Sequence, residues 1–277
     1  MIKFSILIAN YNNGKYFKEC CHSLINQTYR NWEAVIIDDA STDNSVEIIE
    51  SLIKNDYRFK LYQNDTNQGC GFTKAACMQY AQGDLCAYLD PDDALYPEAL
   101  EKTAEEFIHK KDLAAVYSQM KLCDENLNPV STYAGTKQIY NNRYFFNYPI
   151  QVAHFFAFKR ETYLRTRGIN PYLKNAVDQD LYLKILEQGE VKHLKEPLYL
   201  YRIHSHGISQ DQAKQSAKDS FARVIHETMK RRGLKSINYK TVPEIFTSSQ
   251  EIFELLTYQT NRMHRIISKI KVTLDNI

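Results

Sequence analysis

The first hundred residues alternate short apolar runs with longer stretches whose apolar residues recur at helical spacing. Each short run has the length of a buried strand, and each longer stretch has the periodicity of a helix. Strands separated by helices in this rhythm predict a parallel sheet that is covered on both faces. The four predicted strands span residues 4–9, 33–37, 59–62 and 85–89. We therefore expect an α/β fold.

Polar residues follow three of these strands where each one ends, at residues 10–14, 38–39 and 90–93. Parallel strands place their C-terminal ends at one edge of the sheet, where open α/β sheets bind ligands. We therefore expect these polar ends to gather at one site. Its carboxylates suit ribose hydroxyls, and Tyr11 offers a flat face for a base.

The most informative segment is Asp90-Pro91-Asp92-Asp93, directly after the fourth strand. Three acids in four positions repel one another and resist desolvation, and a cation would relieve both. Hard oxygen ligands suit Mg²⁺ or Mn²⁺, and these ions in turn suit diphosphates. A solvated acidic turn is the alternative, since Asp and Pro are common turn residues. A calcium loop is disfavoured because Leu95 stands where that loop needs Gly.

Composition places few limits on function. The chain has 277 residues, 44% hydrophobic and 25% charged, with a net charge of +2, which gives no argument for a nucleic-acid partner. The six cysteines lack metal-site spacing and suit buried thiols in a reducing compartment. No signal peptide or membrane-spanning run is evident, so a cytoplasmic location is expected, with the inner face of the membrane as an alternative. No Gly-rich phosphate loop is present, so phosphate binding would rely on the metal.

Four ordered motifs resemble the family 2 glycosyltransferases, which have the GT-A nucleotide-sugar fold. Residues 5–12 resemble the opening strand and loop of the family, with Ala9 in place of the usual Pro. Residues 35–43 resemble the strand end that binds the nucleotide, and residues 67–69 with Lys74 resemble the segment before the Asp-x-Asp strand. Residues 89–93 resemble the metal and ribose motif. The resemblance covers roughly residues 3–205.

The resemblance implies a set of donor-site residues and a divalent cofactor, Mn²⁺ or Mg²⁺. Asp92 or Asp93 would hold the metal, and His204 would complete its ligands. His204 belongs to residues 197–205, which resemble the late Tyr-Arg-x-His strand of the family. The implied nucleotide-binding residues are Ala9, Tyr11, Asp39, Lys74, Asp90 and Asp92.

The resemblance also implies an acceptor side in the second half. Residues 177–184 open a predicted helix and resemble the Glu-Asp-x-Asp segment of the family, with Val177 in place of the Glu. Asp178 would then be the catalytic base, while Asp180 would order the helix or the loop. Helix capping is the alternative for both, because acids favour helix N-termini. His154 is a candidate acceptor contact.

The implied activity is inverting transfer of a sugar from a nucleotide sugar, expected to be a UDP-sugar, to a hydroxyl of a glycan or lipid-linked glycan. By analogy, the setting is the synthesis of bacterial surface polysaccharide. Two alternatives stay open: a metal-dependent nucleotidyltransferase and a non-catalytic nucleotide-sugar-binding protein. The expected GT-A domain spans residues 1–208, with a nucleotide-binding half at 1–100 and an acceptor-binding half at 101–208. Residues 209–277 form a helical extension.

This extension has two predicted parts. Residues 211–232 suit a charged helix that ends at Gly233. Further on, apolar residues follow a heptad-like seam for which three interpretations stay open: packing on its own domain, a homodimer through a short coiled coil, or contact with a membrane surface through flanking basic residues. The seam comprises Phe246, Phe253, Leu256, Met263, Ile267, Ile270 and Leu274, and the basic residues are Arg262, Arg265, Lys269 and Lys271.

Overall fold

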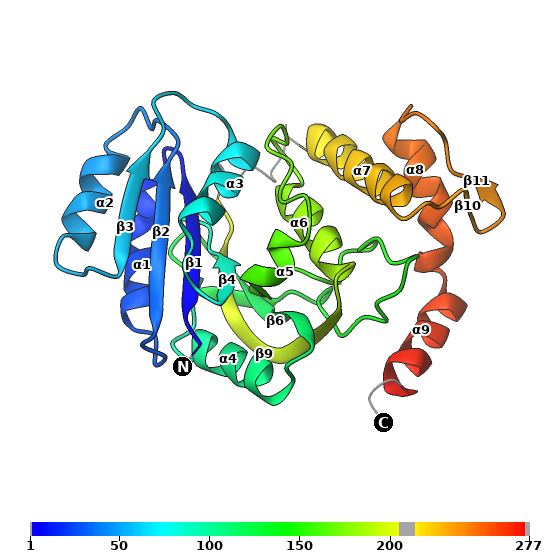
Figure 1. The fold of residues 1–277 in the computed structure, drawn as a ribbon, viewed down its shortest axis with the longest axis horizontal. Helices are drawn as coiled ribbons and strands as arrows, with labels where there is room; N and C mark the ends of the chain where they lie inside the picture. The colour runs from blue at the N-terminus through cyan, green and yellow to red at the C-terminus, as the bar shows by residue number, and fades with distance from the viewer. Residues whose placement is uncertain (1, 205–213, 275–277) are drawn as a thin grey trace.

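The computed structural model describes residues 2–204 and 214–274. A twisted sheet runs through the centre with helices against both faces, and the C-terminal helices lie at one side (Figure 1). Among the described residues, nine strands form one sheet in the order β3-β2-β1-β4-β8-β6-β9-β5, with β7 paired to β6. The expected α/β class is confirmed.

The N-terminal part of the sheet is parallel throughout. Strand β1 pairs in parallel with β2 and β4, and β2 pairs in parallel with β3. All four predicted strands and the helices between them are confirmed, so their C-terminal ends lie at one edge of the sheet. The elements are β1 (Phe4–Asn10), α1 (Gly14–Ile25), β2 (Trp32–Asp38), α2 (Ser45–Ile53), β3 (Phe59–Gln63), α3 (Cys70–Tyr80) and β4 (Leu85–Tyr88).

The second part extends the same sheet with mixed pairing. Strand β8 is antiparallel to both β4 and β6, and so joins the two parts. Strand β9 runs parallel to β6 and pairs with β5, which places its C-terminal end beside the acidic segment after β4. The elements are β5 (Ala94–Leu95), α4 (Ala99–His109), β6 (Leu113–Cys123), β7 (Pro129–Thr132), β8 (Phe156–Lys159), α5 (Arg160–Leu164), α6 (Val177–Leu186) and β9 (Glu190–Arg202).

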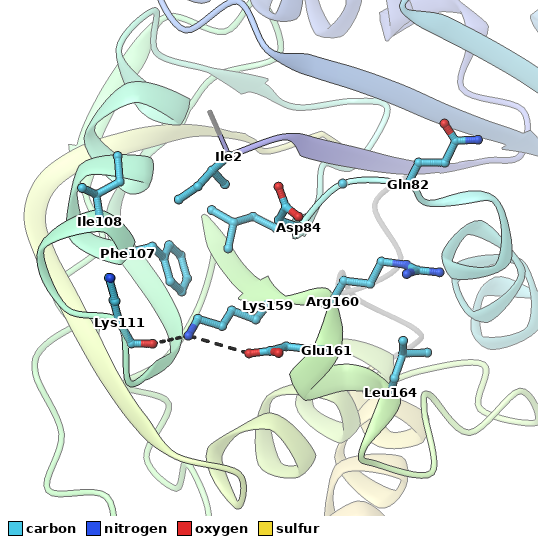
Figure 2. A pocket seen from close by; sticks show the side chains of 12 residues that line it. Ile2, Gln82, Asp84, Phe107, Ile108, Lys111, Lys159, Arg160, Glu161 and Leu164 are labelled. Atoms are coloured by element: carbon cyan, nitrogen blue, oxygen red, sulfur yellow. Dashed lines mark hydrogen bonds and ion pairs between the residues drawn. The ribbon is translucent and has the colours of Figure 1, made fainter.

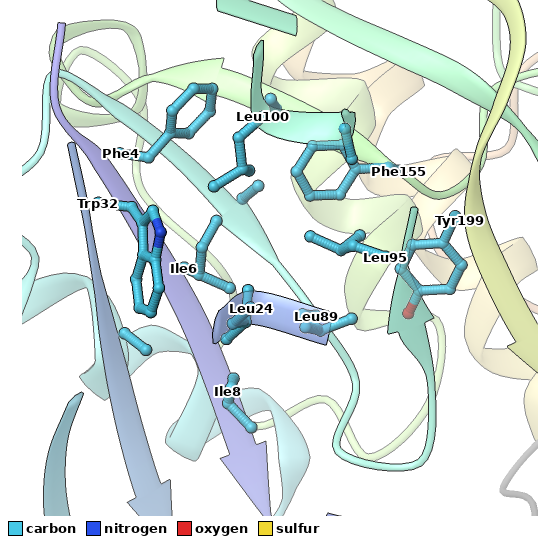
Figure 3. Packing of buried hydrophobic residues seen from close by; sticks show 14 of the residues in the cluster. Phe4, Ile6, Ile8, Leu24, Trp32, Leu89, Leu95, Leu100, Phe155 and Tyr199 are labelled. Carbon is cyan, nitrogen blue, oxygen red and sulfur yellow. The ribbon is translucent and has the colours of Figure 1, made fainter. Parts of the chain in front are cut away.

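The apolar core on one face of the sheet fixes the position of α1. Side chains of α1 at the spacing of one helical face are fully buried, including Phe17 and Leu24. Figure 3 shows Leu24 beside Ile6 and Ile8 of β1, and Tyr199 of β9 at the far end of the same cluster. Because α1 is held in this way, the polar loop between β1 and α1 is held at the sheet edge.

The C-terminal region has its own apolar cluster, formed mainly by α7 and α8. Its elements are α7 (Lys214–Arg231), β10 (Ser236–Ile237), β11 (Lys240–Thr241), α8 (Ser249–Leu256), a 3₁₀ turn (Thr257–Thr260) and α9 (Arg262–Leu274). The predicted charged helix and its stop are confirmed from residue 214, with Gly233 at a φ of 64°. Residues 211–213, Ser205 and the predicted domain boundary at 208 lie outside the described residues.

The prediction of one seam through the last helices is wrong. The 3₁₀ turn and Asn261, whose backbone is extended, break the helix between α8 and α9. Phe253 and Leu256 on α8 are buried in the C-terminal cluster, as the first interpretation of the seam expects. Met263 and Ile270 on α9 are exposed. None of the helices in the described ranges has the length and apolar character that crossing a bilayer needs.

Glu33 on β2 ties three strands together from a buried position. Its carboxylate accepts hydrogen bonds from Lys3 Nζ at 2.8 Å, Ser5 Oγ at 2.7 Å, Lys60 Nζ at 3.0 Å and the amide N of Gln82 at 2.7 Å. Burial opposes ionisation of Glu33, but these hydrogen bonds outweigh it and lower its pKa to about 2. The folded pKa therefore lies below that of an unfolded Glu, about 4.3.

This difference predicts a pH-dependent stability. Because the folded pKa is depressed, ionised Glu33 stabilises the fold above about pH 4.3, and this contribution is lost as the pH falls toward about 2. We expect Glu33→Gln to lower the free energy of unfolding most near neutral pH, and its difference from wild type to shrink in acid. Urea denaturation between about pH 2 and pH 7 measures this difference in the free energy of unfolding. The exposed Glu50→Gln control should show no such trend, and a gap that grows in acid would contradict the assignment.

Candidate functional site

One buried cation joins the two parts of the molecule at the C-terminal edge of the sheet. Lys74 Nζ lies 2.8 Å from Asp178 Oδ1 and 3.0 Å from Asp90 Oδ1. Lys74 comes from α3, Asp90 follows β4, and Asp178 lies in the first turn of α6. Three residues that the sequence assigned to the donor and acceptor sides therefore share one ion-pair cluster.

Local contacts fix the positions of Lys74 on α3 and Asp178 on α6. The Tyr88 hydroxyl donates to the carbonyl oxygen of Lys74 at 2.6 Å, which fixes α3 on β4. The amide N of Gly71 donates to Leu173 O at 3.0 Å, which joins the start of α3 to the loop before α6. A Cβ at Gly71 would come within 2.5 Å of that carbonyl oxygen, so this approach requires glycine.

The electrostatics of the cluster favour charged side chains. Burial opposes the charge of Lys74, but Asp178 and Asp90 outweigh it and raise the pKa of Lys74 well above its ordinary value. Burial likewise opposes ionisation of Asp90, but Lys74 and then His154 lower its pKa overall. Lys74 thus stays protonated and Asp90 ionised near neutral pH.

His154 lies against the same two carboxylates. Its Nε2 is 3.9 Å from Asp90 Oδ2 and 3.9 Å from Asp178 Oδ2. Its ring stacks on Tyr199 with a centroid distance of 5.0 Å, and its Nδ1 lies 3.4 Å from the Tyr182 hydroxyl. His154 is therefore oriented from two sides, next to the predicted base.

Helix α6 begins without the side-chain cap that the alternative interpretation of Asp178 and Asp180 expects. Ala176 occupies the N-cap position with a φ of 56°, and Asp178 is turned toward Lys74. Asp180 accepts hydrogen bonds from the amide N of Asn170 at 2.8 Å and from Lys184 Nζ at 2.7 Å. Asp180 thus orders the helix and its preceding loop, as expected, and the capping alternative is wrong for Asp178.

Asp92 and His204 form a second polar pair, with His204 Nε2 2.9 Å from Asp92 Oδ2. The His204 ring packs on Tyr16, at a centroid distance of 4.7 Å. Arg202 Nε donates to the carbonyl oxygen of Asp92 at 2.6 Å. The structure therefore brings together two of the three predicted metal ligands.

Asp93 is turned into the fold rather than toward His204. Its Oδ2 accepts from the Tyr199 hydroxyl at 2.7 Å, and its Oδ1 accepts from the amide N of Arg202 at 2.7 Å. Burial, reinforced by Asp92 and Asp90, raises the pKa of Asp93 well above its ordinary value. Asp93 therefore links the acidic segment to β9.

The predicted nucleotide-binding residues line the ends of β1 and β2. Asp39 is buried, and its carboxylate accepts from the amide N atoms of Gln68 at 2.9 Å and Gly69 at 2.7 Å and from Asn64 Nδ2 at 2.7 Å. A carboxylate has about four lone-pair sites, so Asp39 retains room for one further donor. Tyr11, at the end of β1, is 42% exposed and offers its ring face to a ligand.

Ala9 lies near the end of β1, opposite Ile37 of β2, and is partly exposed. The neighbouring loop is fixed by Asp38, whose Oδ1 accepts from Asn10 Nδ2 at 2.7 Å and whose Oδ2 accepts from the amide N of Ser41 at 2.8 Å. This network preforms the strand edge on which Tyr11 and Asp39 sit.

The sequence did not single out Tyr199 or Tyr182 as site residues. Tyr199 contacts His154 with its ring and Asp93 with its hydroxyl, and it also accepts from the amide N of Asp90 at 3.3 Å. The only available signal was the position of Tyr199 two residues before the tyrosine of the late strand motif. An alternating strand pattern alone gives such a tyrosine no role beyond the core.

A cavity of about 570 Å³ lies at the other end of the sheet, where β1 and β4 begin (Figure 2). Phe107 and Ile108 give it an apolar wall, and Lys159 pairs with Glu161 at 3.9 Å on its rim. It contains none of the predicted site residues. Ligands of α/β sheets bind at the C-terminal ends of the strands, so we assign the donor site to the opposite edge.

The Asp92 and His204 pair fits a divalent cation. Two neighbouring ligands of an octahedral ion at about 2.1 Å from the metal lie about 3 Å apart, which matches the 2.9 Å between Asp92 Oδ2 and His204 Nε2. Carboxylate oxygen is a ligand that suits Mg²⁺ and Mn²⁺, and imidazole nitrogen is a common ligand of transition metals. In the described part of the chain, Asp90, His154 and Asp178 also place ligand atoms within 4.8 Å of one another, but Lys74 Nζ already forms ion pairs with both carboxylates there.

Comparisons with known proteins identify the family of the chain. A family model described as Glycosyl transferase family 2 matches residues 5–165, more than half of the chain. The chain is 32% identical over 253 residues to the hyaluronan synthase of Pasteurella multocida, covering 90% of this chain and 25% of that protein. It is 30% identical over 241 residues to the chondroitin synthase of Escherichia coli, covering 87% of this chain and 34% of that protein. The chain thus spans about a quarter to a third of these relatives.

Solved structures show the same fold at low identity. S. aureus TarS 1-349 in complex with UDP-GlcNAc has a TM-score of 0.69 at 20% identity, covering 94% of this chain and 72% of that chain. The mannosyltransferase PcManGT from Pyrobaculum calidifontis in complex with GDP-Man and Mn²⁺ has a TM-score of 0.58 at 12% identity, covering 99% and 87%. The matched family and these relatives give no support to a nucleotidyltransferase or to a non-catalytic binding protein.

Removing the shared cation tests the ion-pair cluster. Lys74→Met leaves Asp90 and Asp178 without their cation, so we expect a loss of about 1–3 kcal/mol, less than the about 3–5 kcal/mol of a fully buried pair because both carboxylates are partly exposed. Urea denaturation measures this loss. The exposed Lys54→Met should change stability by less than about 0.5 kcal/mol.

The double variant Lys74→Met/Asp178→Asn distinguishes the ion pair from lost packing. With one of the two uncompensated charges removed, it should recover part of the stability that Lys74→Met loses. If the double variant loses as much free energy of unfolding as the two single variants together, Lys74 and Asp178 are not coupled.

Proposed function

This chain belongs to glycosyl transferase family 2 and has a GT-A type α/β fold, and we propose that it transfers a sugar from a UDP-sugar to a hydroxyl of a glycan with inversion. The observation that carries the proposal is the bridge of Lys74 between Asp90 and Asp178. It joins the strand end that suits a nucleotide to the helix start that suits an acceptor. A site for nucleotide binding alone has no need of that second carboxylate.

The donor side consists of the edge formed by β1, β2 and β4. The base would stack on the exposed ring of Tyr11 and hydrogen-bond to Asp39, while the backbone at Ala9 lies alongside. Asp90 and Asp92 would face the ribose and the diphosphate. TarS, which shares the fold, binds UDP-GlcNAc, and this supports a uridine nucleotide as the donor.

Asp92 and His204 would hold the metal, Mn²⁺ or Mg²⁺, rather than Asp93. The distance between their ligand atoms fits one ion, whereas both oxygens of Asp93 are engaged by Tyr199 and Arg202. When bound, a divalent cation there supplies positive charge to the departing diphosphate. The complex of PcManGT with Mn²⁺ supports a metal in this fold.

Asp178 would act as the general base. Lys74 holds its Oδ1, while its Oδ2 lies 3.9 Å from His154, beyond hydrogen-bond distance, and can accept a proton. The acceptor hydroxyl oxygen forms a bond to the anomeric carbon as its proton passes to Oδ2. The bond from that carbon to the diphosphate oxygen breaks on the opposite face, and UDP leaves with the electron pair. His154 would orient the acceptor hydroxyl.

The relatives support a proposal for the acceptor and the cellular setting. Hyaluronan and chondroitin synthases build polysaccharides, and so we propose a glycan or lipid-linked glycan acceptor in bacterial surface polysaccharide synthesis. Residues 1–100 would bind the donor and residues 101–208 the acceptor. The reaction would take place in the cytoplasm.

Replacing the base tests the catalytic assignment. Asp178→Asn keeps the size of the side chain but cannot take up the proton, so we expect transfer to fall by about 100-fold or more. UDP release from UDP-GlcNAc and other UDP-sugars, with hyaluronan or chondroitin oligosaccharides as acceptors, measures the rate. UDP affinity should change only a few-fold, and Asp112→Asn, an exposed Asp to Asn change, should leave both values unchanged. Near-normal transfer by Asp178→Asn would remove Asp178 from the mechanism.

Replacing a metal ligand tests the cofactor assignment by binding alone. Calorimetry of UDP with wild-type protein should show higher affinity with Mn²⁺ than without it. Asp92→Ala should lose this gain, by about 10-fold or more, because one of two protein ligands is gone. Asp112→Ala should retain it. An Asp92→Ala variant with the full manganese-dependent gain would place the metal elsewhere.

A further inference from the structure

Helix α9 presents its apolar side to solvent. Figure 1 shows this helix at the outer edge of the C-terminal region, beyond α8. Its apolar residues follow the spacing of a single helical face, within an arc of about 100°. All five are exposed, by 47–68%: Met263, Ile266, Ile267, Ile270 and Leu274. A surface helix of a globular protein normally buries such a face.

The other side of α9 faces the body of the protein. His264, Ser268 and Val272, spaced four residues apart, are the partly buried residues of the helix. The His264 ring packs edge-on against Tyr258 at a centroid distance of 5.0 Å. The exposed apolar face is therefore turned away from the body, and a rotation of the helix would be needed to bury it.

Basic residues border this apolar face on both sides. Arg262 and Lys269 lie along one border, and Lys271 lies along the other, where its Nζ is 5.1 Å from the ring centroid of Tyr140. Arg265 lies farther round the helix, next to Val272. The stretch Arg262–Leu274 contains no Asp or Glu. The helix thus combines an outward apolar face with positive charge at both borders.

This combination favours an anionic bilayer surface over a second copy of the chain. The basic borders of two such helices, brought face to face, would repel each other. An amphipathic helix in the plane of a bilayer buries its apolar face among acyl chains and places its basic residues at the headgroups.

We propose that α9 is an interfacial anchor that binds membranes rich in anionic phospholipid. The apolar face enters the boundary between headgroups and acyl chains, and the bordering residues Arg262, Lys269 and Lys271 contact lipid phosphates. The anchor goes beyond the proposed sugar transfer, and vesicle binding does not require catalysis. Failure of the anchor and failure of the activity are therefore separate results.

Vesicle sedimentation of the full chain tests the anchor. The protein should pellet with vesicles of phosphatidylglycerol and phosphatidylcholine, pellet far less with phosphatidylcholine alone, and be released by high salt. Ile266→Ser/Ile270→Ser should weaken binding by about 10-fold or more, because two exposed apolar side chains leave the acyl boundary. Ile245→Ser, at a site 78% exposed outside α9, should bind as wild type does.

A charge variant and a mass measurement complete the test. Arg262→Gln/Lys269→Gln should weaken binding to the anionic vesicles, whereas Lys54→Gln should not. All replaced side chains are exposed, so the thermal midpoints should match that of wild type. Absence of binding, or equal binding by Ile266→Ser/Ile270→Ser, would overturn the proposal. If light scattering shows a dimer of the wild-type protein that Ile266→Ser/Ile270→Ser dissociates, the apolar face of α9 binds a second copy of the chain and not a membrane.

Discussion

A single buried ammonium group holds the candidate site together. Asp90 and Asp178 come from chain segments 88 residues apart (178 − 90), and without Lys74 their like charges would drive them apart in a partly desolvated setting. With Lys74 between them, the end of β4 and the start of α6 are drawn to one point. The relative position of the donor and acceptor sides is therefore an electrostatic property as well as a consequence of sheet pairing.

The adjacent residues Asp92 and Asp93 of the acidic segment make different contacts. Asp93 points into the fold, where Tyr199 and the backbone of Arg202 hold it, and this anchors the loop to β9. With its neighbour fixed in this way, Asp92 pairs with His204 instead. Burial of one carboxylate thus orients the other, which explains how three acids in four positions avoid competing for one ligand. The same tyrosine orients His154, so β9 supports both polar clusters of the site.

Local patterns were sufficient for the first half of the fold. The strands of the first half and the helices between them follow from apolar periodicity, because each buries a face that the sequence marks clearly. The roles of Tyr199 and Glu33 depend on partners far away in sequence: Tyr199 and Asp93 are 106 residues apart, and Glu33 and Gln82 are 49 apart. Periodicity carries no information about such pairs. The break before α9 was missed for a similar reason, since heptad spacing continues across the extended residue Asn261.

The two proposed surfaces use different parts of the molecule, and this separation has a physical consequence. Helix α8 is secured by the apolar cluster it shares with α7, whereas α9 follows a 3₁₀ turn and has no fully buried side chain among its described residues. Bilayer contacts at α9 would therefore affect the packing of the C-terminal apolar cluster and leave the ion pairs of Lys74 unchanged. Figure 1 places α9 at the opposite side of the molecule from α2 and β3, with α6 and β9 between them. An enzyme bound through α9 would therefore have its membrane contact on the side of the molecule away from α2 and β3.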